Sequence, residues 1–240
     1  MASLNFLPLN TRKKIGILGG TFDPPHLGHL KLASHFAKHL NLDTLLLIPS
    51  GEPWQKGSGI TPAEIRLQLT EAAGIDLARA LLYLKIPTQV GIDRIEIDRA
   101  GPSYMLDTAK ALRDRFGSEA SLICLMGADS LVNLPSWHAW QDLMGYLNFA
   151  VASRPNYDLG VKITPAVKQL LDKHQTSESS ALENCASGLI YLDETLSVDL
   201  SSTDLRNRLK APARCSIESE QIPSHTLEII TKLGLYQQSS

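Results

Sequence analysis

Short apolar runs alternate with amphipathic segments along the first part of the chain. Residues 14–18 form a mainly apolar run that ends at Gly19-Gly20, as a buried parallel strand ends in a tight turn. Apolar residues then recur at spacings of three and four, which predicts a helix over about residues 26–40. Residues 44–48 predict the next strand, which closes at Pro49-Ser50-Gly51. The pattern up to this point predicts one βαβ unit.

The alternation continues toward the C-terminus. Thr61-Pro62-Ala63-Glu64 predicts a helix start, because Thr61 can cap the helix and Pro62 suits its first turn. The polar, serine-rich residues 172–187 predict a mobile surface loop. Further strands are predicted over residues 90–97, 122–126, 148–152 and 189–192, and further helices after Gly101-Pro102-Ser103 and over residues 201–209 and 223–233.

Strands that alternate with helices predict an α/β fold with a parallel sheet, helices on both of its faces and a small helical C-terminal part. No internal repeat or linker divides the sequence, so we expect a single domain over residues 1–240 with a core over about residues 14–236. Ligands of such sheets bind beyond the carboxyl ends of the strands. We therefore expect the functional residues directly after the strands.

Composition and charge exclude several classes of protein. With 43% hydrophobic and 20% charged residues, the chain is unlike a disordered protein, a collagen or a coiled coil. Its net charge of −2 argues against a surface that coats nucleic acid. The three cysteines form no C-x-x-C pair, which argues against a disulfide framework and a cysteine zinc cluster. Neither a secretory signal pattern nor an apolar run of about 18 residues occurs, so we expect a cytoplasmic protein with no membrane partner.

The first predicted strand is followed by Gly19-Gly20-Thr21-Phe22-Asp23-Pro24-Pro25-His26-Leu27-Gly28-His29. Glycines let a ligand approach the backbone closely, and a helix N-terminus attracts phosphate. His26 and His29 lie on one face of the first helical turn and can donate to the same phosphate.

Three alternatives stay open for this motif: a metal site at the two histidines, a dinucleotide-binding turn, and a purely structural pair. The sequence has no H-E-x-x-H and no nearby third ligand, and the glycines lack the G-x-G-x-x-G spacing. His35 and His39, further along the same helix, are predicted to face solvent.

Five motifs in order make the chain recognisable. The segment from Gly19 to His29 resembles the H-x-G-H motif of the nucleotidyltransferase superfamily, which implies a Rossmann-like nucleotidyltransferase fold. Four further segments resemble motifs of the nicotinate-nucleotide adenylyltransferases, namely residues 101–108, residues 127–130 with 134–137, residues 153–155 and residues 201–206. The resemblance covers about residues 14–236.

The resemblance implies a reaction. ATP and nicotinate mononucleotide would give nicotinate adenine dinucleotide and pyrophosphate, a step of NAD biosynthesis. In that family the phosphate of the mononucleotide attacks the α-phosphorus of ATP directly, and Mg²⁺ accompanies the triphosphate. ATP and nicotinate mononucleotide are then the partners, no nucleic acid is implied, and a homo-oligomer stays open.

The resemblance also assigns roles to residues, with no metal ligand among the protein side chains. Catalytic roles fall on His26, His29, Lys56 and Arg206. ATP binding falls on Gly19, Gly20, Thr21, Phe22, Gly127, Asp129, Ser201, Ser202 and Thr203. Mononucleotide binding falls on Ser103, Tyr104, Met105 and Trp137.

The chemistry of these residues agrees with nucleotidyl transfer, which needs aligned anionic substrates and neutralised charge. The forked guanidinium of Arg206 suits the β- and γ-phosphates, and the flat indole of Trp137 can stack on a pyridine ring. Backbone N–H groups of residues 103–105 would favour the nicotinate carboxylate over an amide. The alternatives are that Asp129 caps its helix and that Trp137, like Trp140, belongs to the core.

Three residues depart from the family pattern, one of them Asn156, which stands in place of the glycine of the R-P-G turn. Gln55 stands where the family commonly has the histidine of P-P-H-K, with Lys56 kept, and Met105 stands where it usually has threonine. Three rivals stay open: nicotinamide mononucleotide as the acceptor, another adenylyltransferase or cytidylyltransferase on the same H-x-G-H scaffold, and a catalytically silent nucleotide-binding module. Nucleic-acid binding would need a salt-sensitive DNA shift to support it.

Overall fold

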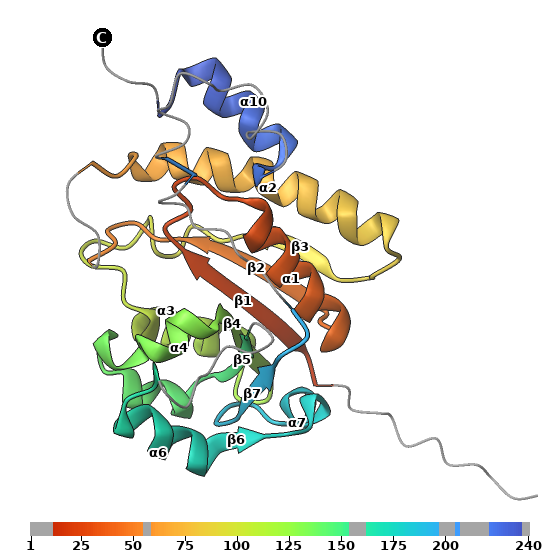
Figure 1. The fold of residues 1–240 in the computed structure, drawn as a ribbon, viewed down its shortest axis with the longest axis vertical. Helices are drawn as coiled ribbons and strands as arrows, with labels where there is room; N and C mark the ends of the chain where they lie inside the picture. The colour runs from red at the N-terminus through yellow and green to blue at the C-terminus, as the bar shows by residue number, and fades with distance from the viewer. Residues whose placement is uncertain (1–11, 55–58, 154–161, 197–204, 207–220, 237–240) are drawn as a thin grey trace, which may run out of the picture.

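The computed structural model describes residues 12–54, 59–153, 162–196, 205–206 and 221–236 (Figure 1). Within these ranges, parallel strands form a seven-stranded sheet in the order β3-β2-β1-β4-β5-β7-β6. The strands are β1 (Lys14–Gly20), β2 (Thr44–Pro49), β3 (Gln89–Ile92), β4 (Ser121–Gly127), β5 (Asn148–Ala152), β6 (Gln175–Thr176) and β7 (Ile190–Asp193). The predicted α/β fold with a parallel sheet is confirmed.

Strand β1 lies in the middle of the sheet and pairs with β2 on one side and β4 on the other. Its register runs from Ile15 opposite Thr44 to Gly20 opposite Pro49 along β2. Because β2 and β3 continue the sheet to one side while β4 and β5 continue it to the other, the strand order reverses between β1 and β4. That reversal is where ligands bind in sheets of this kind.

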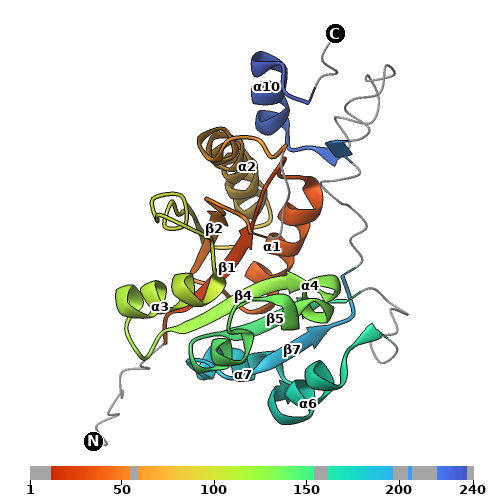
Figure 2. The same ribbon diagram turned by 90° about the vertical axis from the view of Figure 1, so that its left-hand side faces the viewer.

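Helices cover both faces of the sheet (Figures 1 and 2). The helical segments are α1 (Leu27–His39), α2 (Ala63–Tyr83), α3 (Met105–Phe116), α4 (Ala128–Val132), η1 (Leu134–Ser136), η2 (Trp140–Gly145), α6 (Pro165–His174), α7 (Ser179–Asn184) and α10 (Ser224–Leu233). Ile15 and Ile17 of β1 belong to an apolar cluster with α3, α4, α6, η1 and η2, whereas Leu18 belongs to a second cluster with α1, α2 and α7. The strands read as continuous apolar runs because both of their faces are buried.

The C-terminal helix α10 packs along α2 on the side away from the sheet (Figure 1). Leu69 of α2 and Ile230 of α10 share a small apolar cluster with Leu205 and Ile222. Leu205 and Arg206 are helical, and the rest of the helix predicted over residues 201–209 lies outside the described residues. No helix in the described ranges combines the length and apolar character needed to cross a membrane.

Two predicted boundaries are wrong. Strand β3 ends at Ile92, not at residue 97, because the Asp93 carboxylate accepts the N–H of Ile95 and turns the chain out of the sheet. Helix α2 begins at Ala63 after Pro62, and Thr61 does not cap it. The backbone N–H of Thr61 instead donates to the carboxylate of Asp23, at 3.3 Å.

Residues 172–187 are not the predicted loop, since they hold the end of α6, strand β6 and helix α7. Buried polar side chains of β4 and β5 hold this segment by hydrogen bonds. Ser121 donates to the carbonyl of Leu182, and Asn148 donates to the carbonyl of Cys185, at 2.5 and 2.7 Å. The sequence does not reveal these hydrogen bonds, because their acceptors are backbone carbonyls, which every residue carries.

Candidate active site

The carboxyl end of β1 and the start of α1 bring the two histidines of the first motif together. His26 occupies the N-cap position of α1, and its backbone N–H donates to Nδ1 of His29 at 3.1 Å. The two imidazole rings stack with their centroids 3.6 Å apart. The predicted placement on one face of the first turn is therefore correct.

Both histidines are held in the neutral form. Burial lowers the pKa of His26 to about 4 from 6.5. An edge of His29 stays open to the cavity, but protein encloses most of its ring, and burial lowers its pKa well below 6.5. Because Nδ1 of His29 accepts a hydrogen bond, the proton of its neutral ring is assigned to Nε2. The pair therefore offers neutral N–H donors.

A first cavity opens beside this pair, between the ends of β1 and β4. His26 and His29 line one side of it, and Gly127 and Asp129 line the other. A side chain at Gly127 would meet no neighbouring atom within 4 Å, so its backbone borders open space. Gly127 is the N-cap of α4, which places Asp129 inside the first turn rather than at the predicted alternative cap position.

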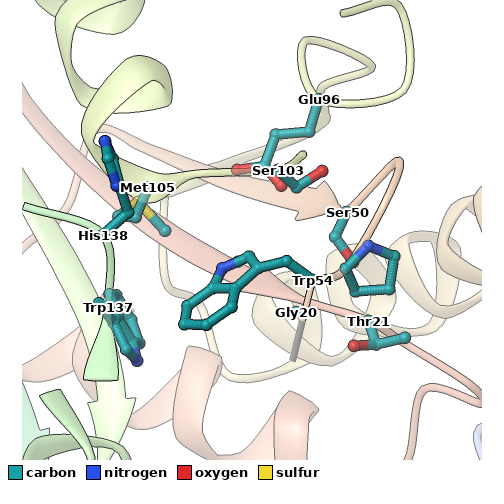
Figure 3. Close-up of a pocket in the computed structure, with 11 residues that line it drawn as sticks. Gly20, Thr21, Ser50, Trp54, Glu96, Ser103, Met105, Trp137 and His138 are labelled. Atoms are coloured by element: carbon teal, nitrogen blue, oxygen red, sulfur yellow. The ribbon is translucent and has the colours of Figure 1, made fainter. Parts of the chain in front are cut away.

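A second cavity adjoins the first, and Gly19 lines both. Figure 3 shows Ser50 and Thr21 on one side of it, Met105, His138 and Trp137 on the other, and the Trp54 indole between them. Glu96 and Ser103 complete its rim. A methyl group added at Gly19 would lie 2.9 Å from Cε of Met105, so the shared wall is thin.

The structure distributes the predicted ATP residues between the two cavities. Gly20 and Thr21 line the second cavity, whereas Gly127 and Asp129 line the first. Phe22 lines neither of them. Its buried ring, 2% exposed, makes an edge contact with His29 at 5.0 Å between centroids and so supports the histidine from behind.

Two of the three predicted N–H donors before α3 are already used. The N–H of Ser103 donates to the carbonyl of Glu52, and that of Tyr104 donates to the carbonyl of Pro102. Helix α3 begins at Met105, which lines the second cavity. The backbone N–H groups that could still meet a nicotinate carboxylate are therefore those in the first turn of α3.

Trp137 reaches the second cavity, and Trp140 does not line it. Both indoles also pack against the apolar cluster on this face of the sheet. Trp137 therefore combines the two predicted alternatives, because one part of its ring supports the core while another borders the cavity.

Arg206 lies against the loop that precedes α1. Its guanidinium donates to the carbonyl of Asp23 at 2.5 Å and lies 3.8 Å from the carboxylate of the same residue. The Asp23 carboxylate also accepts from the Tyr236 hydroxyl at 2.6 Å. Lys56, Ser201, Ser202 and Thr203 lie outside the described residues, as do the residues 154–155 of the fourth motif.

His35 is not solvent-facing as predicted. It is half-buried, and its Nε2 lies 2.8 Å from the buried carboxylate of Asp193, at the end of β7. His39 is exposed, as predicted. Neither histidine lines either cavity described above.

Two buried polar atoms at the cavities have no hydrogen-bond partner among the described residues: Nδ1 of His26 and Oγ of Ser50. His26 lines the first cavity and Ser50 lines the second. Buried polar groups are normally paired, so atoms of this kind mark where a ligand is expected.

Sequence reasoning missed Ser50, Trp54, Glu96 and His138 as cavity residues. Ser50 and Trp54 follow the second strand, and the rule that ligands bind beyond strand ends could have found them. Glu96 was hidden because residues 90–97 were predicted to be a strand. His138 lies in an irregular segment whose direction the pattern does not reveal.

The parallel fold and a matching family model define the class as nucleotidyltransferase: the model described as cytidylyltransferase-like matches residues 17–208. A "Probable nicotinate-nucleotide adenylyltransferase" of Herminiimonas arsenicoxydans is 33% identical over 93% of this chain and 96% of its own length. One of Aeromonas salmonicida is 36% identical over 93% and 97%. The chain belongs to the nicotinate-nucleotide adenylyltransferase family.

Solved structures agree on the fold. The nicotinic acid mononucleotide adenylyltransferase of Plasmodium falciparum complexed with NaAD superposes with a TM-score of 0.65, covering 94% of this chain and 98% of that one. The same protein complexed with APC gives a TM-score of 0.61. Because the sequence identities are 15% and 16%, these comparisons show similarity of fold alone.

Proposed function

We propose that this protein transfers the adenylyl group of ATP to nicotinate mononucleotide, releasing nicotinate adenine dinucleotide and pyrophosphate. The observation that carries the proposal is the pair of adjoining cavities that share Gly19 at the reversal of strand order, each with a buried polar atom that has no partner among the described residues. A reaction between two nucleotides needs two such sites side by side. The family membership supports the same reaction.

ATP occupies the first cavity in this proposal. The N-terminus of α1 directs its positive dipole end to the phosphates, and His26 and His29 add side-chain donors. Asp129 can accept hydrogen bonds from the ribose hydroxyls. Because the imidazoles are neutral, they orient the phosphates, and cationic groups such as Arg206 neutralise charge.

The mononucleotide occupies the second cavity, with its pyridine ring on Trp137 and its phosphate directed at the wall formed by Gly19. From there an oxygen of its phosphate attacks the α-phosphorus of ATP in line with the departing pyrophosphate. The P–O bond to pyrophosphate breaks as the new P–O bond forms, and no bond to the protein is needed. Catalysis then rests on alignment and charge stabilisation.

The second cavity favours the acid over the amide. The first turn of α3 presents the positive end of a 12-residue helix near Met105, which attracts a carboxylate. Burial raises the pKa of Glu96 on the same rim, against hydrogen bonds from Thr108 and Ser103 that lower it.

Mg²⁺ enters with the triphosphate in this proposal. Among the described residues, no three His, Cys, Asp or Glu side chains gather as a metal site. Mg²⁺ binds through one or two carboxylates together with substrate phosphates, and Asp129 is a carboxylate in the first cavity. When bound, the ion neutralises charge that develops on the phosphates.

We also propose a cytoplasmic location, supported by the free thiols of Cys124 and Cys185, which suit a reducing compartment. Whether the protein forms a homo-oligomer stays open, and light scattering on the purified protein measures its oligomeric state.

Turnover tests the proposal directly. The purified protein is incubated with Mg²⁺, ATP or CTP, and nicotinate or nicotinamide mononucleotide, and dinucleotide and pyrophosphate are quantified together. We expect product from ATP with the acid, at least about tenfold faster than with the amide, since one well-placed charged hydrogen bond is worth that factor. Turnover with the amide alone would reassign the acceptor. Turnover with CTP alone would reassign the donor, and no product from any pair would leave a silent nucleotide-binding module.

A further inference from the structure

Arg66 of α2 is a buried arginine that lines neither the first nor the second cavity, although it borders a third hollow that adjoins the second at Pro53 and Trp54. Its side chain is 1% exposed, and its guanidinium donates four hydrogen bonds to backbone carbonyls. Nη1 donates to Thr21 and Ser50 at 2.9 and 2.5 Å, Nη2 donates to Gly51 at 2.8 Å, and Nε donates to Thr61 at 2.8 Å. The forked guanidinium therefore holds three separate backbone segments at once.

Those segments are the loop after β1, the loop after β2 and the approach to α2. Burying a guanidinium is costly, and carbonyl oxygens repay that cost only if they are held where the donors point. Burial accordingly lowers the pKa of Arg66, and the nearby Asp23 carboxylate opposes that change. A lysine ammonium could not reach all of these carbonyls, since it is a compact group without the planar fork.

The loop after β2 is also held from its other side. The Ser103 hydroxyl oxygen accepts hydrogen bonds from the N–H groups of Gly51 and Glu52, at 2.9 and 3.2 Å. With its carbonyls fixed by Arg66 and its N–H groups fixed by Ser103, this loop has little freedom. Ser50 is the residue that turns inward from it, 8% exposed, with its hydroxyl unpaired among the described residues and facing the second cavity (Figure 3).

We propose that Arg66 is a positioning residue that presents the Ser50 hydroxyl to the mononucleotide in the second cavity. The inference rests on the proposed function, because it takes the mononucleotide as the ligand of that cavity. Arg66 lines neither the first nor the second cavity. It acts through the carbonyl of Ser50, and through that of Thr21 on the same wall.

A double-mutant cycle tests this coupling. Ser50→Ala removes one hydrogen bond and should raise the KM for nicotinate mononucleotide about tenfold. Arg66→Lys should raise the same KM at least as much, because it frees the loop. The ATP KM should change less than about twofold in both variants, since Ser50 and Thr21 do not line the first cavity.

The double variant gives the decisive value. If Arg66 acts through Ser50, Ser50→Ala has no further effect on the mononucleotide KM in the Arg66→Lys background. Independent roles would instead multiply the two effects to about 100-fold, and that outcome overturns the proposal. An unchanged mononucleotide KM in Ser50→Ala, or equal rises of both KM values in Arg66→Lys, overturns it as well.

Matched control variants separate the loss of positioning by Arg66 from nonspecific effects of a substitution. Ser34→Ala removes a hydroxyl that donates to the Leu30 carbonyl within α1, and Arg94→Lys alters an exposed arginine. Both should retain wild-type KM values. If circular dichroism shows that Arg66→Lys does not fold, Arg66→Gln takes its place in the cycle. Glutamine keeps two N–H donors and buries no charge. If the wild type shows no turnover, the proposed function fails on its own, and the cycle is read from calorimetric Kd values for nicotinate mononucleotide.

Discussion

The rings of His26 and His29 stack 3.6 Å apart between centroids, with Nδ1 of His29 bound to the backbone N–H of His26. One histidine thus fixes the tautomer and orientation of the other. In the proposed function the pair directs neutral N–H donors to a phosphate, and each ring supplies one of them.

Removing either ring should therefore impair turnover without unfolding the protein. We expect His26→Ala and His29→Ala each to lower kcat at least about tenfold, because each removes a donor that stabilises developing charge. Steady-state kinetics measures the effect, with circular dichroism to follow the fold. His39→Ala, on the exposed side of the same helix, is the matched control and should keep the wild-type kcat. Near-normal turnover in both active-site variants would remove the histidines from the mechanism.

Burial of His26 makes stability depend on pH in a defined window. Its pKa is about 4 in the folded protein and about 6.5 in the unfolded chain, so the unfolded chain binds more protons between these values. The free energy of unfolding should therefore fall as the pH drops from about 6.5 to 4. The stability that the neutral form of His26 allows is fully present above pH 6.5. The full difference corresponds to about 3 kcal/mol.

Urea denaturation near pH 7 and near pH 4.5 measures this effect. His26→Gln should lose about 2 kcal/mol less than the wild type between the two conditions, because glutamine does not titrate. His39→Gln should follow the wild type. Equal losses in the wild type and His26→Gln would show that His26 is not held neutral by the fold.

Trp137→Ala should raise the KM for nicotinate mononucleotide about tenfold and leave the ATP KM almost unchanged. The indole borders the second cavity only, and aromatic stacking is worth about 1 kcal/mol beyond the area buried. Trp137→Phe keeps a flat ring and should recover most of the loss. If both KM values rise together in Trp137→Ala, the indole acts through the core and not by stacking.

Much of this arrangement could be predicted from residues 14–51. The apolar runs and the glycines that end them fix where strands stop, and the H-x-G-H motif directly follows such an end. The prediction failed where hydrogen bonds between side chains and the backbone, one local and two long-range, decide the structure. The Asp93 carboxylate ends β3 by a local turn, and Ser121 and Asn148 capture the carbonyls of α7 from 34 or more residues away.

The candidate site shows the same division. His26, His29, Gly127 and Asp129 could be found because their motif spacing is visible in the sequence. Arg66 could not, since an arginine on an amphipathic helix normally faces solvent, and only the fold brings the loops after β1 and β2 to it. The cavity-lining residues that belong to sequence motifs could therefore be predicted, whereas a residue that holds the loops around a cavity could not.

Gly51 marks a place where the loop after β2 cannot accept a side chain. A methyl group added there would lie 2.2 Å from the carbonyl oxygen of Glu96, and this contact is with backbone that has to move. We expect Gly51→Ala to lower the free energy of unfolding by about 1–3 kcal/mol and to raise the mononucleotide KM, because Ser50 and Trp54 move with the loop. Gly145→Ala is the matched control, since its added methyl would meet nothing within 4 Å. Urea denaturation and steady-state kinetics on both variants measure the effects, and a Gly51→Ala protein with wild-type stability and KM would show that this loop is free to shift.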